Sequence, residues 1–437
     1  MSGAKEEAAA RKGGAGYLLP ALGIWAVSRI MPLARFGLTG IGADIAAYHT
    51  NFERCFADFF SCAATPVALL AYLLHAAGIE TDATVVGLSI AANAFLGWAI
   101  WLAAKHYFSP RAALWSAGIF ALSMPQFVAW WSVFVNMEIA LALALVAMVA
   151  YERRSKWSAA AAAIAGIVHP VTLAPLALAA AGMAISDRGR RRHALTLLVT
   201  AIAGTAAYRF PELRGYAENA AAYATGSYGT DRQLLFAGHF LNFSLYHDAL
   251  MLFYIPFALM TIARSLSGGT AAFPALYATI ALAMVMLHAL FYNRFIIAFD
   301  VMAIAMAGQS AELFARRAAS GAMGKALLIG TCAILGGYLL WQSVRMEPLM
   351  NRQEFEEIRS FSDRYPGLTI FVNDPTYRQF VEGYSGHETI AAPFAREPWR
   401  MRRMPALIYN ARRSTPFLPR NDAHAEKISE RFWKWSP

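Results

Sequence analysis

The sequence predicts an all-α polytopic membrane protein of about eleven transmembrane helices, followed by a small C-terminal α/β domain outside the membrane. Hydrophobic residues make up 58% of the 437-residue chain and charged residues 15%, and the mean hydropathy is +0.40. Apolar runs recur along most of the chain, and many are long enough to cross about 30 Å of hydrocarbon. This composition excludes a soluble globular enzyme.

Membrane orientation explains the net charge of +10 better than nucleic-acid binding does. Lysine and arginine gather in short clusters between the apolar runs, as the positive-inside rule predicts for cytoplasmic loops. The clusters are Lys5/Arg11/Lys12, Lys105/Arg111, Arg153/Arg154/Lys156, Arg188/Arg190/Arg191/Arg192, Arg264 and Arg316/Arg317/Lys325. With all of them inside, the N-terminus is cytoplasmic, the C-terminus is outside, and no nucleic-acid partner is expected.

The crossings that satisfy this alternation lie in residues 17–343, after a cytoplasmic tail at 1–16. They are Tyr17–Ala34, Val85–Ala104, Ala112–Pro125, Asn136–Tyr151, Trp157–Val168, Pro170–Ile185, Ala194–Tyr208, Tyr246–Ala263, Phe273–Phe291, Phe295–Phe314 and Ala326–Trp341. The run Cys62–Ile79 would break the alternation, so we expect it to lie in or dip into the outer leaflet. The spans on either side of His169 are short and predict a hairpin of stubby helices.

Three outer loops and an outer domain follow from this topology. The loops cover residues 35–84, 126–135 and 209–245, and the domain covers 344–437. In the domain, the segments LTIFVND, TYRQFVEGY and ETIAAP predict a strand–helix–strand unit.

The first outer loop carries the segment GIGADIAAYHTNFER, from Gly40 to Arg54, which contains the first candidate functional residues. A carboxylate at Asp44 is placed to deprotonate an acceptor hydroxyl. Alternatively, Asp44 is a helix cap or a surface charge on an interfacial helix. Tyr48 and His49 follow one turn later and are candidate substrate-binding residues.

Four more ionisable residues lie at membrane depth, where such side chains are costly and face a cavity or a partner. Glu138 opens an apolar helix, where a helix dipole also favours an acid. His169 precedes a proline at a tight turn, where a structural hydrogen bond is the alternative. Arg294 opens a span from the outer side, and either reaches lipid headgroups or clamps a phosphate. Asp300, deeper in the same span, is a partner for Arg294 or a buried polar contact.

The order of these features resembles the C-type (GT-C) superfamily of polytopic glycosyltransferases, which use polyprenyl-phosphate sugars. In that family an acidic motif follows the first helix, as Asp44 does in GADIAAYH, and a proline-started juxtamembrane segment comes next, as in ATPVALLAYLLHAAG. A hairpin then leads through a proline to a second outer acid, as in ALSMPQFVAWWSVFVNMEIALAL with Glu138. His169 stands where a basic or polar residue follows the next hairpin, and Arg294 in NRFIIAF matches a late outer arginine. An outer soluble domain closes the chain.

The resemblance implies transfer of a sugar from a polyprenyl-phosphate donor to a glycan, lipid or protein acceptor at the outer face of the cytoplasmic membrane. Asp44 would act as general base or orient the acceptor, and Glu138 would help at the acceptor or at an optional divalent metal. Arg294, with Arg232 and His169, would neutralise the leaving lipid phosphate.

Three alternatives stay open from the sequence. GADIAAYHTNF and IVHPVTLAP are also similar to membrane polysaccharide polymerases, which join lipid-linked repeat units. A non-catalytic lipid or sugar transporter is the second alternative, although the sequence shows no internal repeat. The third is a structural membrane protein, in which the polar residues at helix ends have no role in function.

Overall fold

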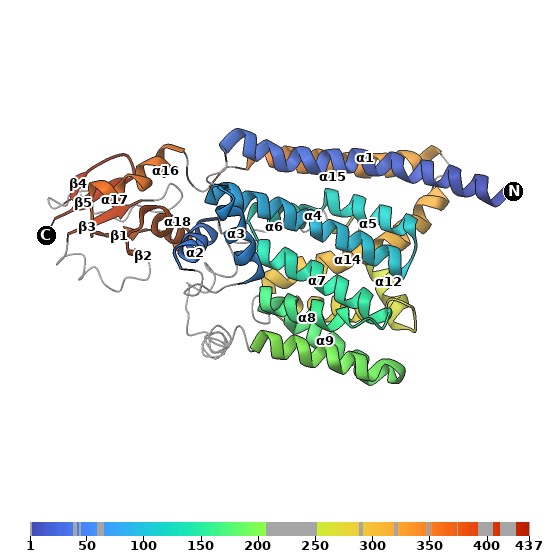
Figure 1. Cartoon of the computed structure of the whole chain (residues 1–437). Coiled ribbons are helices and arrows are strands. Elements are labelled where there is room, and N and C mark those ends of the chain that lie inside the picture. Colours follow the sequence, from blue (N-terminus) through green and yellow to red (C-terminus); the bar gives the residue numbers. More distant parts are fainter. Residues whose placement is uncertain are drawn as a thin grey trace.

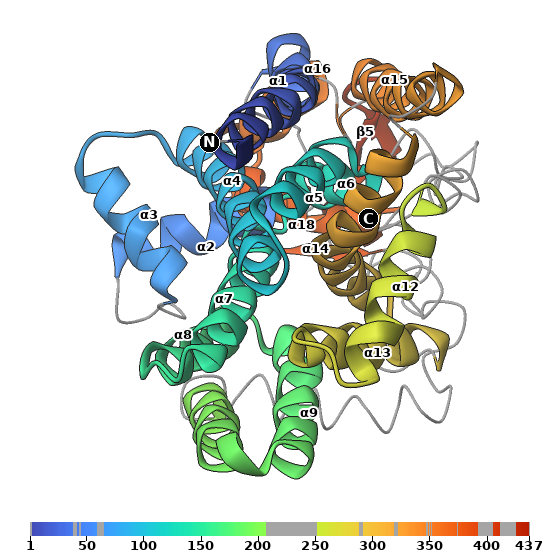
Figure 2. The same ribbon diagram turned by 90° about the vertical axis from the view of Figure 1, so that its right-hand side faces the viewer.

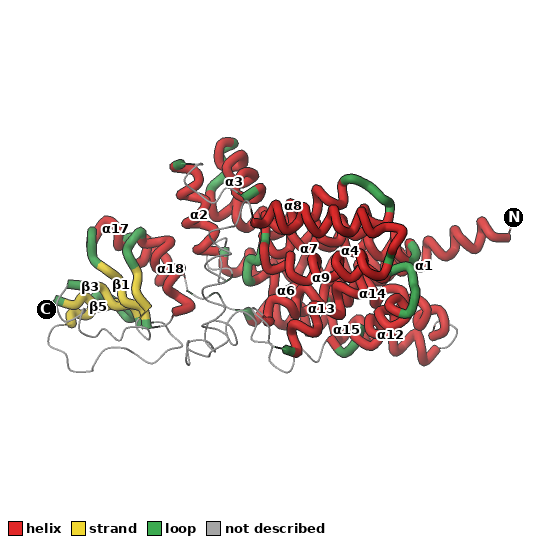
Figure 3. Tube along the Cα trace, turned by 90° about the horizontal axis from the view of Figure 1, so that it is seen from below, coloured by secondary structure: helices red, strands yellow, loops and turns green. Residues whose placement is uncertain are grey.

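The structure is a computed structural model in which a helical bundle carries a small α/β unit at one end, and the N-terminus lies at the other end (Figure 1). The α/β unit and the bundle are separated by two short helices, and a view from below shows the same order (Figure 3). The residues described are 2–37, 42, 45–58, 65–206, 251–287, 292–318, 322–346, 348, 350, 352–373, 375–391, 405–410 and 425–436.

The first helix, α1 (Ser2–Phe36), contains the first expected crossing and extends it by fifteen residues toward the N-terminus. The segment that the sequence suggested as a polar tail therefore continues this helix. α15 (Ala322–Arg345) packs beside α1 along one edge of the bundle (Figure 1). Leu19, Ile30 and Ile329 are exposed on these two helices, as expected for helices whose outer faces contact lipid rather than protein.

Five helices form the centre of the bundle: α4 (Thr81–Tyr107), α5 (Pro110–Leu122), α6 (Met124–Trp131), α7 (Val135–Glu152) and α14 (Tyr292–Ala318). α14 packs against α5, α12 and α13 and lies among them in the end view (Figure 2). α5 and α6 meet at a bend of 54°, where the Ser123 hydroxyl accepts a hydrogen bond from the Gln126 N–H and so caps α6. The second expected outer loop is therefore mostly helix.

The remaining described bundle helices are shorter. α8 (Trp157–Val168) and α9 (Pro170–Ser186) form the expected hairpin at His169, and a short 3₁₀ turn, η1 (Arg188–Arg190), leads into a helix over 191–206. α12 (Ile255–Leu266) and α13 (Ala272–Met286) complete this side of the bundle. Proline at the first position of α9 and at the second position of α12 fits helix starts, where its missing N–H costs nothing.

The expected count of about eleven crossings is not confirmed. Among the described residues, four helices are long and apolar enough to cross a membrane, or five if the bent α5–α6 pair counts as one span. The four are α4, α7, α14 and α15. Helices such as α8, with 12 residues, reach only about 18 Å at 1.5 Å per residue. The apolar helices nevertheless define an integral membrane protein.

The basic connections gather at the end of the bundle that lies away from the α/β unit. Arg190, in η1, pairs with Glu152 at the end of α7. The His193 ring contacts the Ser155 carbonyl at 3.1 Å, and the Thr270 hydroxyl donates to the Tyr107 carbonyl at 3.2 Å. The α4–α5, α7–α8, α9–η1 and α12–α13 connections therefore share one end, as the charge pattern predicts.

Two helices, α2 (Ile45–Ala57) and α3 (Pro66–Ala76), lie outside the bundle near the start of α4 (Figure 2). The Thr65 hydroxyl caps α3 by accepting from the Ala68 N–H. Eleven residues cannot cross a membrane, and Leu69 and Leu73 are 47% and 57% exposed. The non-crossing interpretation of this apolar run thus agrees with the short helix.

The C-terminal unit contains α16 (Arg352–Arg359), α17 (Phe361–Arg364), α18 (Pro375–Ser385) and a five-stranded sheet. The strands are β1 (Thr369–Val372), β2 (Thr389–Ala391), β3 (Ala406–Tyr409), β4 (Ala425–Lys427) and β5 (Phe432–Trp435), in the order β2-β1-β3-β5-β4. β1 pairs in parallel with β2 and β3, whereas β5 is antiparallel to β3 and β4. The expected strand–helix–strand segment is β1–α18–β2.

One hydrophobic core joins the C-terminal unit to the bundle. Ile370 and Val372 on one face of β1 belong to the same buried cluster as Ile45 of α2 and Val85 of α4. Phe371 points to the opposite face of the sheet, as the strand alternation requires. The small unit therefore completes its core against the membrane part rather than by itself.

Candidate active site

The turn between α6 and α7, residues 132–138, connects most of the candidate residues that the structure describes; we call it the α6–α7 junction. It contains Val133 with φ of 61°, a left-handed conformation that is unfavourable for a β-branched residue. Such strain persists only where the surroundings hold the backbone in place. The side chains that contact this junction are therefore candidates for the active site.

The chain on both sides of Asp44 is packed onto this junction. Gly42 adopts φ of +76°, and a Cβ built on it would lie 2.1 Å from the Trp131 carbonyl oxygen. No side chain fits there, so glycine is required for both reasons. Ile45 is fully buried in the cluster that contains Val133. Asp44 itself lies outside the described residues, but its described neighbours at positions 42 and 45 are held beside the start of α7.

Tyr48 ties α2 to the same junction. Its hydroxyl accepts a hydrogen bond of 3.0 Å from the backbone N–H of Asn136. That N–H is in the first turn of α7, where helical N–H groups have no partner within their own helix. The ring of Tyr48 packs edge-to-face on Phe52, at 5.7 Å between centroids. Tyr48, expected to contact substrate, thus has an anchoring contact in the structure.

Glu138 is fully buried in the first turn of α7 and joins a polar network that crosses three helices. Its Oε1 accepts from Asn93 Nδ2 at 2.7 Å. Asn93 Oδ1 accepts in turn from Trp25 Nε1 at 2.9 Å and from Arg29 Nη2 at 3.5 Å. Glu138 Oε2 has no hydrogen-bond partner among the described residues. One carboxylate oxygen is therefore hydrogen-bonded, and the other is buried without a hydrogen bond from the described residues.

Arg29 supplies the opposite charge for Glu138 and was not among the residues selected from the sequence. It is 1% exposed, and its guanidinium lies 5.3 to 5.8 Å from the ring centroids of Trp25, Phe127 and Trp130. Electrostatic attraction links it to Glu138. A cation within the first apolar span was the available sequence signal, because an ionisable residue there requires a partner.

Arg294 contacts the other side of the junction. Its Nη1 donates to His169 Nε2 at 3.2 Å, and its guanidinium lies 5.1 Å from the centroid of the Phe134 ring. The hydrogen bond requires His169 to accept at Nε2, which makes the ring neutral in this arrangement. Two of the residues predicted for the phosphate side are therefore in contact.

Asp300 is a buried polar contact and not the partner of Arg294. It accepts hydrogen bonds from Ser123 Oγ at 3.0 Å, Gln126 Nε2 at 2.7 Å and Tyr254 Oη at 2.5 Å. These donors come from the α5–α6 bend and the start of α12. The cluster therefore holds the bend that leads to the α6–α7 junction.

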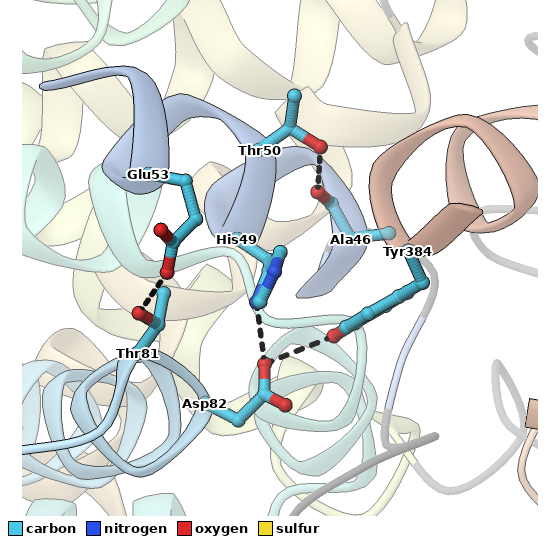
Figure 4. Close-up of polar contacts among 7 residues, drawn as sticks. All are labelled: Ala46, His49, Thr50, Glu53, Thr81, Asp82 and Tyr384. Carbon is cyan, nitrogen blue, oxygen red and sulfur yellow. Dashed lines mark hydrogen bonds and ion pairs between the residues drawn. The ribbon is translucent and has the colours of Figure 1, made fainter. Parts of the chain in front are cut away.

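His49 is paired with a residue that the sequence did not single out. Its Nδ1 lies 2.8 Å from Asp82 Oδ1, in the first turn of α4, and Tyr384 of α18 donates to the same oxygen at 3.1 Å (Figure 4). Asp82 lies in the first turn of α4, where acidic residues are common, so the sequence does not mark it as a functional candidate. Only the tertiary contact distinguishes it.

The remaining predictions cannot be placed. Arg232 and the rest of the third expected outer loop lie outside the described residues, as does Asp44. Within the part of the chain that is described, no three His, Cys, Asp or Glu residues gather as a metal site. The optional divalent metal therefore stays a prediction.

The fold is similar to solved structures of membrane glycosyltransferases. The archaeal oligosaccharyltransferase AglB from Archaeoglobus fulgidus, solved with an inhibitory peptide and a dolichol-phosphate, matches with a TM-score of 0.56 at 13% identity. That alignment covers 86% of this chain, which spans only 64% of the archaeal chain. ArnT from Cupriavidus metallidurans matches with a TM-score of 0.51 at 15% identity, over 92% of this chain and 93% of that chain.

No family model matches the sequence, and no curated protein matches it. The family likeness therefore rests on the fold and on the order of motifs along the chain. Both structural neighbours are C-type glycosyltransferases. The chain therefore shares its fold with these two enzymes.

Proposed function

We propose that this protein transfers a sugar from a polyprenyl-phosphate donor to an acceptor hydroxyl or amide at the outer face of the cytoplasmic membrane. The observation that carries the proposal is the convergence on the α6–α7 junction. The residues flanking Asp44, the Glu138 network and the Arg294–His169 pair all contact or belong to this turn. The carboxylate of Glu138 therefore lies on this turn, and the guanidinium of Arg294 contacts it through the Phe134 ring.

These charges suit the two ends of a glycosyl transfer. The acceptor attacks the anomeric carbon, the bond from that carbon to the phosphate oxygen breaks, and polyprenyl phosphate leaves with the bonding electrons. Asp44 takes the acceptor proton as general base, and Glu138 helps at the acceptor side of the site. Arg294, positioned by His169, stabilises the negative charge that accumulates on the leaving phosphate.

Three observations support the lipid donor and the outer side. The archaeal neighbour binds a dolichol-phosphate. The basic connections of the described bundle share the end away from the α/β unit, which is the cytoplasmic end under the positive-inside rule. Cys55 in α2, at the opposite end, is disulfide-bonded, and disulfides persist in oxidising compartments.

The test uses the full-length protein in native membranes or proteoliposomes. Asp44→Asn keeps the shape of the side chain and removes the base. We expect loss of sugar transfer by at least about 100-fold, with undecaprenyl phosphate still bound at the wild-type affinity. Transfer retained by this variant would remove Asp44 from the mechanism.

The same assay separates the alternative functions. A polymerase would accept only diphosphate-linked oligosaccharides, whereas the proposed enzyme uses a monophosphate-linked sugar. A transporter would move the lipid-linked donor across the bilayer and form no glycosidic bond. Binding of undecaprenyl phosphate without transfer of any supplied sugar would favour transport.

A further inference from the structure

Three elements that are far apart in the sequence meet at the carboxylate of Asp82 (Figure 4). Oδ1 accepts from His49 Nδ1 of α2 at 2.8 Å and from Tyr384 Oη of α18 at 3.1 Å. The side chain of Asp82 is 2% exposed. A buried carboxylate is stable only when it is paired or hydrogen-bonded, so this contact depends on the C-terminal unit being in place.

Tyr384 is positioned for this contact by packing on both sides. Its ring lies 4.5 Å from the His49 ring and 4.4 Å from the Phe355 ring, measured between centroids. Burial, and secondarily the negative charge of Asp82, raises the pKa of the Tyr384 hydroxyl well above its usual range. The hydroxyl therefore remains protonated and donates at every physiological pH.

α2 and α18 also approach each other closely. A Cβ built on Gly383 would lie 2.5 Å from Thr50 Oγ1 and 3.0 Å from the Ala46 carbonyl. A second polar contact fixes α2 to the start of α4, because the Thr81 hydroxyl donates to Glu53. α2 is thus held between the membrane bundle and the C-terminal unit along most of its length.

We propose that Asp82, His49 and Tyr384 form a clamp by which the docked C-terminal unit positions the first turn of α2. This inference rests on the proposed function, because α2 begins at Ile45, the residue after Asp44. His49 and Tyr384 are positioning residues in this account. Undocking of the C-terminal unit removes one of the two surfaces that hold α2, and Ile45, the residue after Asp44, then loses part of the packing that holds it beside Val133.

Hydrogen–deuterium exchange on the full-length protein tests the clamp without any assumption about the sugar. Tyr384→Phe removes only the hydroxyl and keeps the ring contacts. We expect exchange in both α2 and α18 to accelerate about tenfold, since a hydrogen bond to a charged group contributes roughly that factor to local opening. Exchange in α14 should stay at the wild-type rate.

Tyr365→Phe is the matched control, because Tyr365 belongs to the same unit and its hydroxyl makes no hydrogen bond among the described residues. It should leave both helices unchanged. Faster exchange confined to α18, or no change in either helix, would overturn the proposal. Acceleration that includes α14 would also overturn it, because it would mean a general loss of stability.

Covalent rescue gives a second, independent test. Asp82→Ala removes the acceptor of both donors, and we expect a larger acceleration in α2 than Tyr384→Phe causes. Adding Thr50→Cys and Gly383→Cys places two Cβ atoms within disulfide reach. Oxidation should restore wild-type exchange in α2, measured against the same cysteine pair with Asp82 intact. Failure of the closed disulfide to restore α2 protection contradicts a docking role.

Undecaprenyl phosphate binding separates this inference from the proposed function. The clamp variants should bind the lipid phosphate as the wild type does, since Arg294 and His169 are untouched. If the wild-type protein binds no polyprenyl phosphate, the proposed function fails while the exchange result still decides the clamp. If only the exchange result fails, the function stands and the clamp does not.

Discussion

The hydroxyl of Tyr48 accepts a hydrogen bond from the backbone N–H of Asn136 at 3.0 Å. This contact joins the helix that follows Asp44 to the helix that carries Glu138. It also satisfies an N–H group in the first turn of α7, and the expected capping position, Phe134, supplies no side-chain hydrogen bond of its own. Tyr48, which lies in the first expected outer loop, therefore caps α7, the helix that contains Glu138.

Tyr48→Phe should uncouple the two segments. Loss of a helix cap costs about 1 kcal/mol, so we expect sugar transfer to fall about fivefold while lipid phosphate binding is unchanged. The matched control is Tyr277→Phe, because the buried hydroxyl of Tyr277 has no partner among the described residues. An equal loss of transfer in both variants would contradict a specific role for Tyr48.

Arg294→Lys should weaken the binding of undecaprenyl phosphate. Lysine keeps the charge but loses the planar fork that pairs with phosphate oxygens, so we expect roughly tenfold lower affinity in a direct binding assay. Arg345→Lys is the control, because Arg345 also lies over an aromatic ring, that of Trp341, at 4.6 Å. Unchanged affinity of the Arg294 variant would assign this arginine to lipid headgroups instead.

Asn93→Leu should destabilise the bundle. Asn93 is the common partner of Trp25, Arg29 and Glu138, so an apolar side chain removes a hydrogen-bond partner from all three, including the buried Arg29 and Glu138. We expect a loss of roughly 2–4 kcal/mol, seen as a lower apparent melting temperature in detergent. Ser89→Ala, one turn earlier on α4 and with a single 3.4 Å contact to the Trp130 carbonyl, should change it little.

The orientation is tested by cysteine labelling in intact cells. In a Cys332→Ser background, Glu430→Cys in the C-terminal unit should react with a membrane-impermeant maleimide, because the Glu430 side chain is 81% exposed. Arg188→Cys, which is exposed between α9 and the helix over 191–206, should react only after the membrane is opened. The reverse pattern would place the proposed site in the cytoplasm.

Several features of the fold could be predicted from the hydrophobic pattern and from the residues that start and stop helices. α8 has the boundaries that the apolar run and His169-Pro170 predict, and α7 agrees to within one residue at each end. Strong hydrophobic patterns and helix-start prolines are local signals, so they survive without tertiary information. The crossing count did not follow, because apolar runs such as those of α8 and α12 form helices of only 12 residues, too short by length to count as full crossings.

The candidate site was predicted only in part. Glu138 and Arg294 were found because a charge in an apolar span requires a partner, and that cost can be read from sequence. Asn93 and Arg29, the partners of Glu138, were not predicted, and neither was Asp82. A polar side chain on a helix gives no sign of which distant segment it meets.

Burial in hydrocarbon limits composition residue by residue, so a membrane-embedded chain with acids and bases near the ends of its spans can be predicted from the amino acids alone. Which of those groups meet follows from the tertiary fold. Contacts such as Tyr48 with Asn136, or Tyr384 with Asp82, join residues 88 and 302 positions apart. They depend on how the helices pack and how the C-terminal unit docks, and no local pattern encodes that geometry.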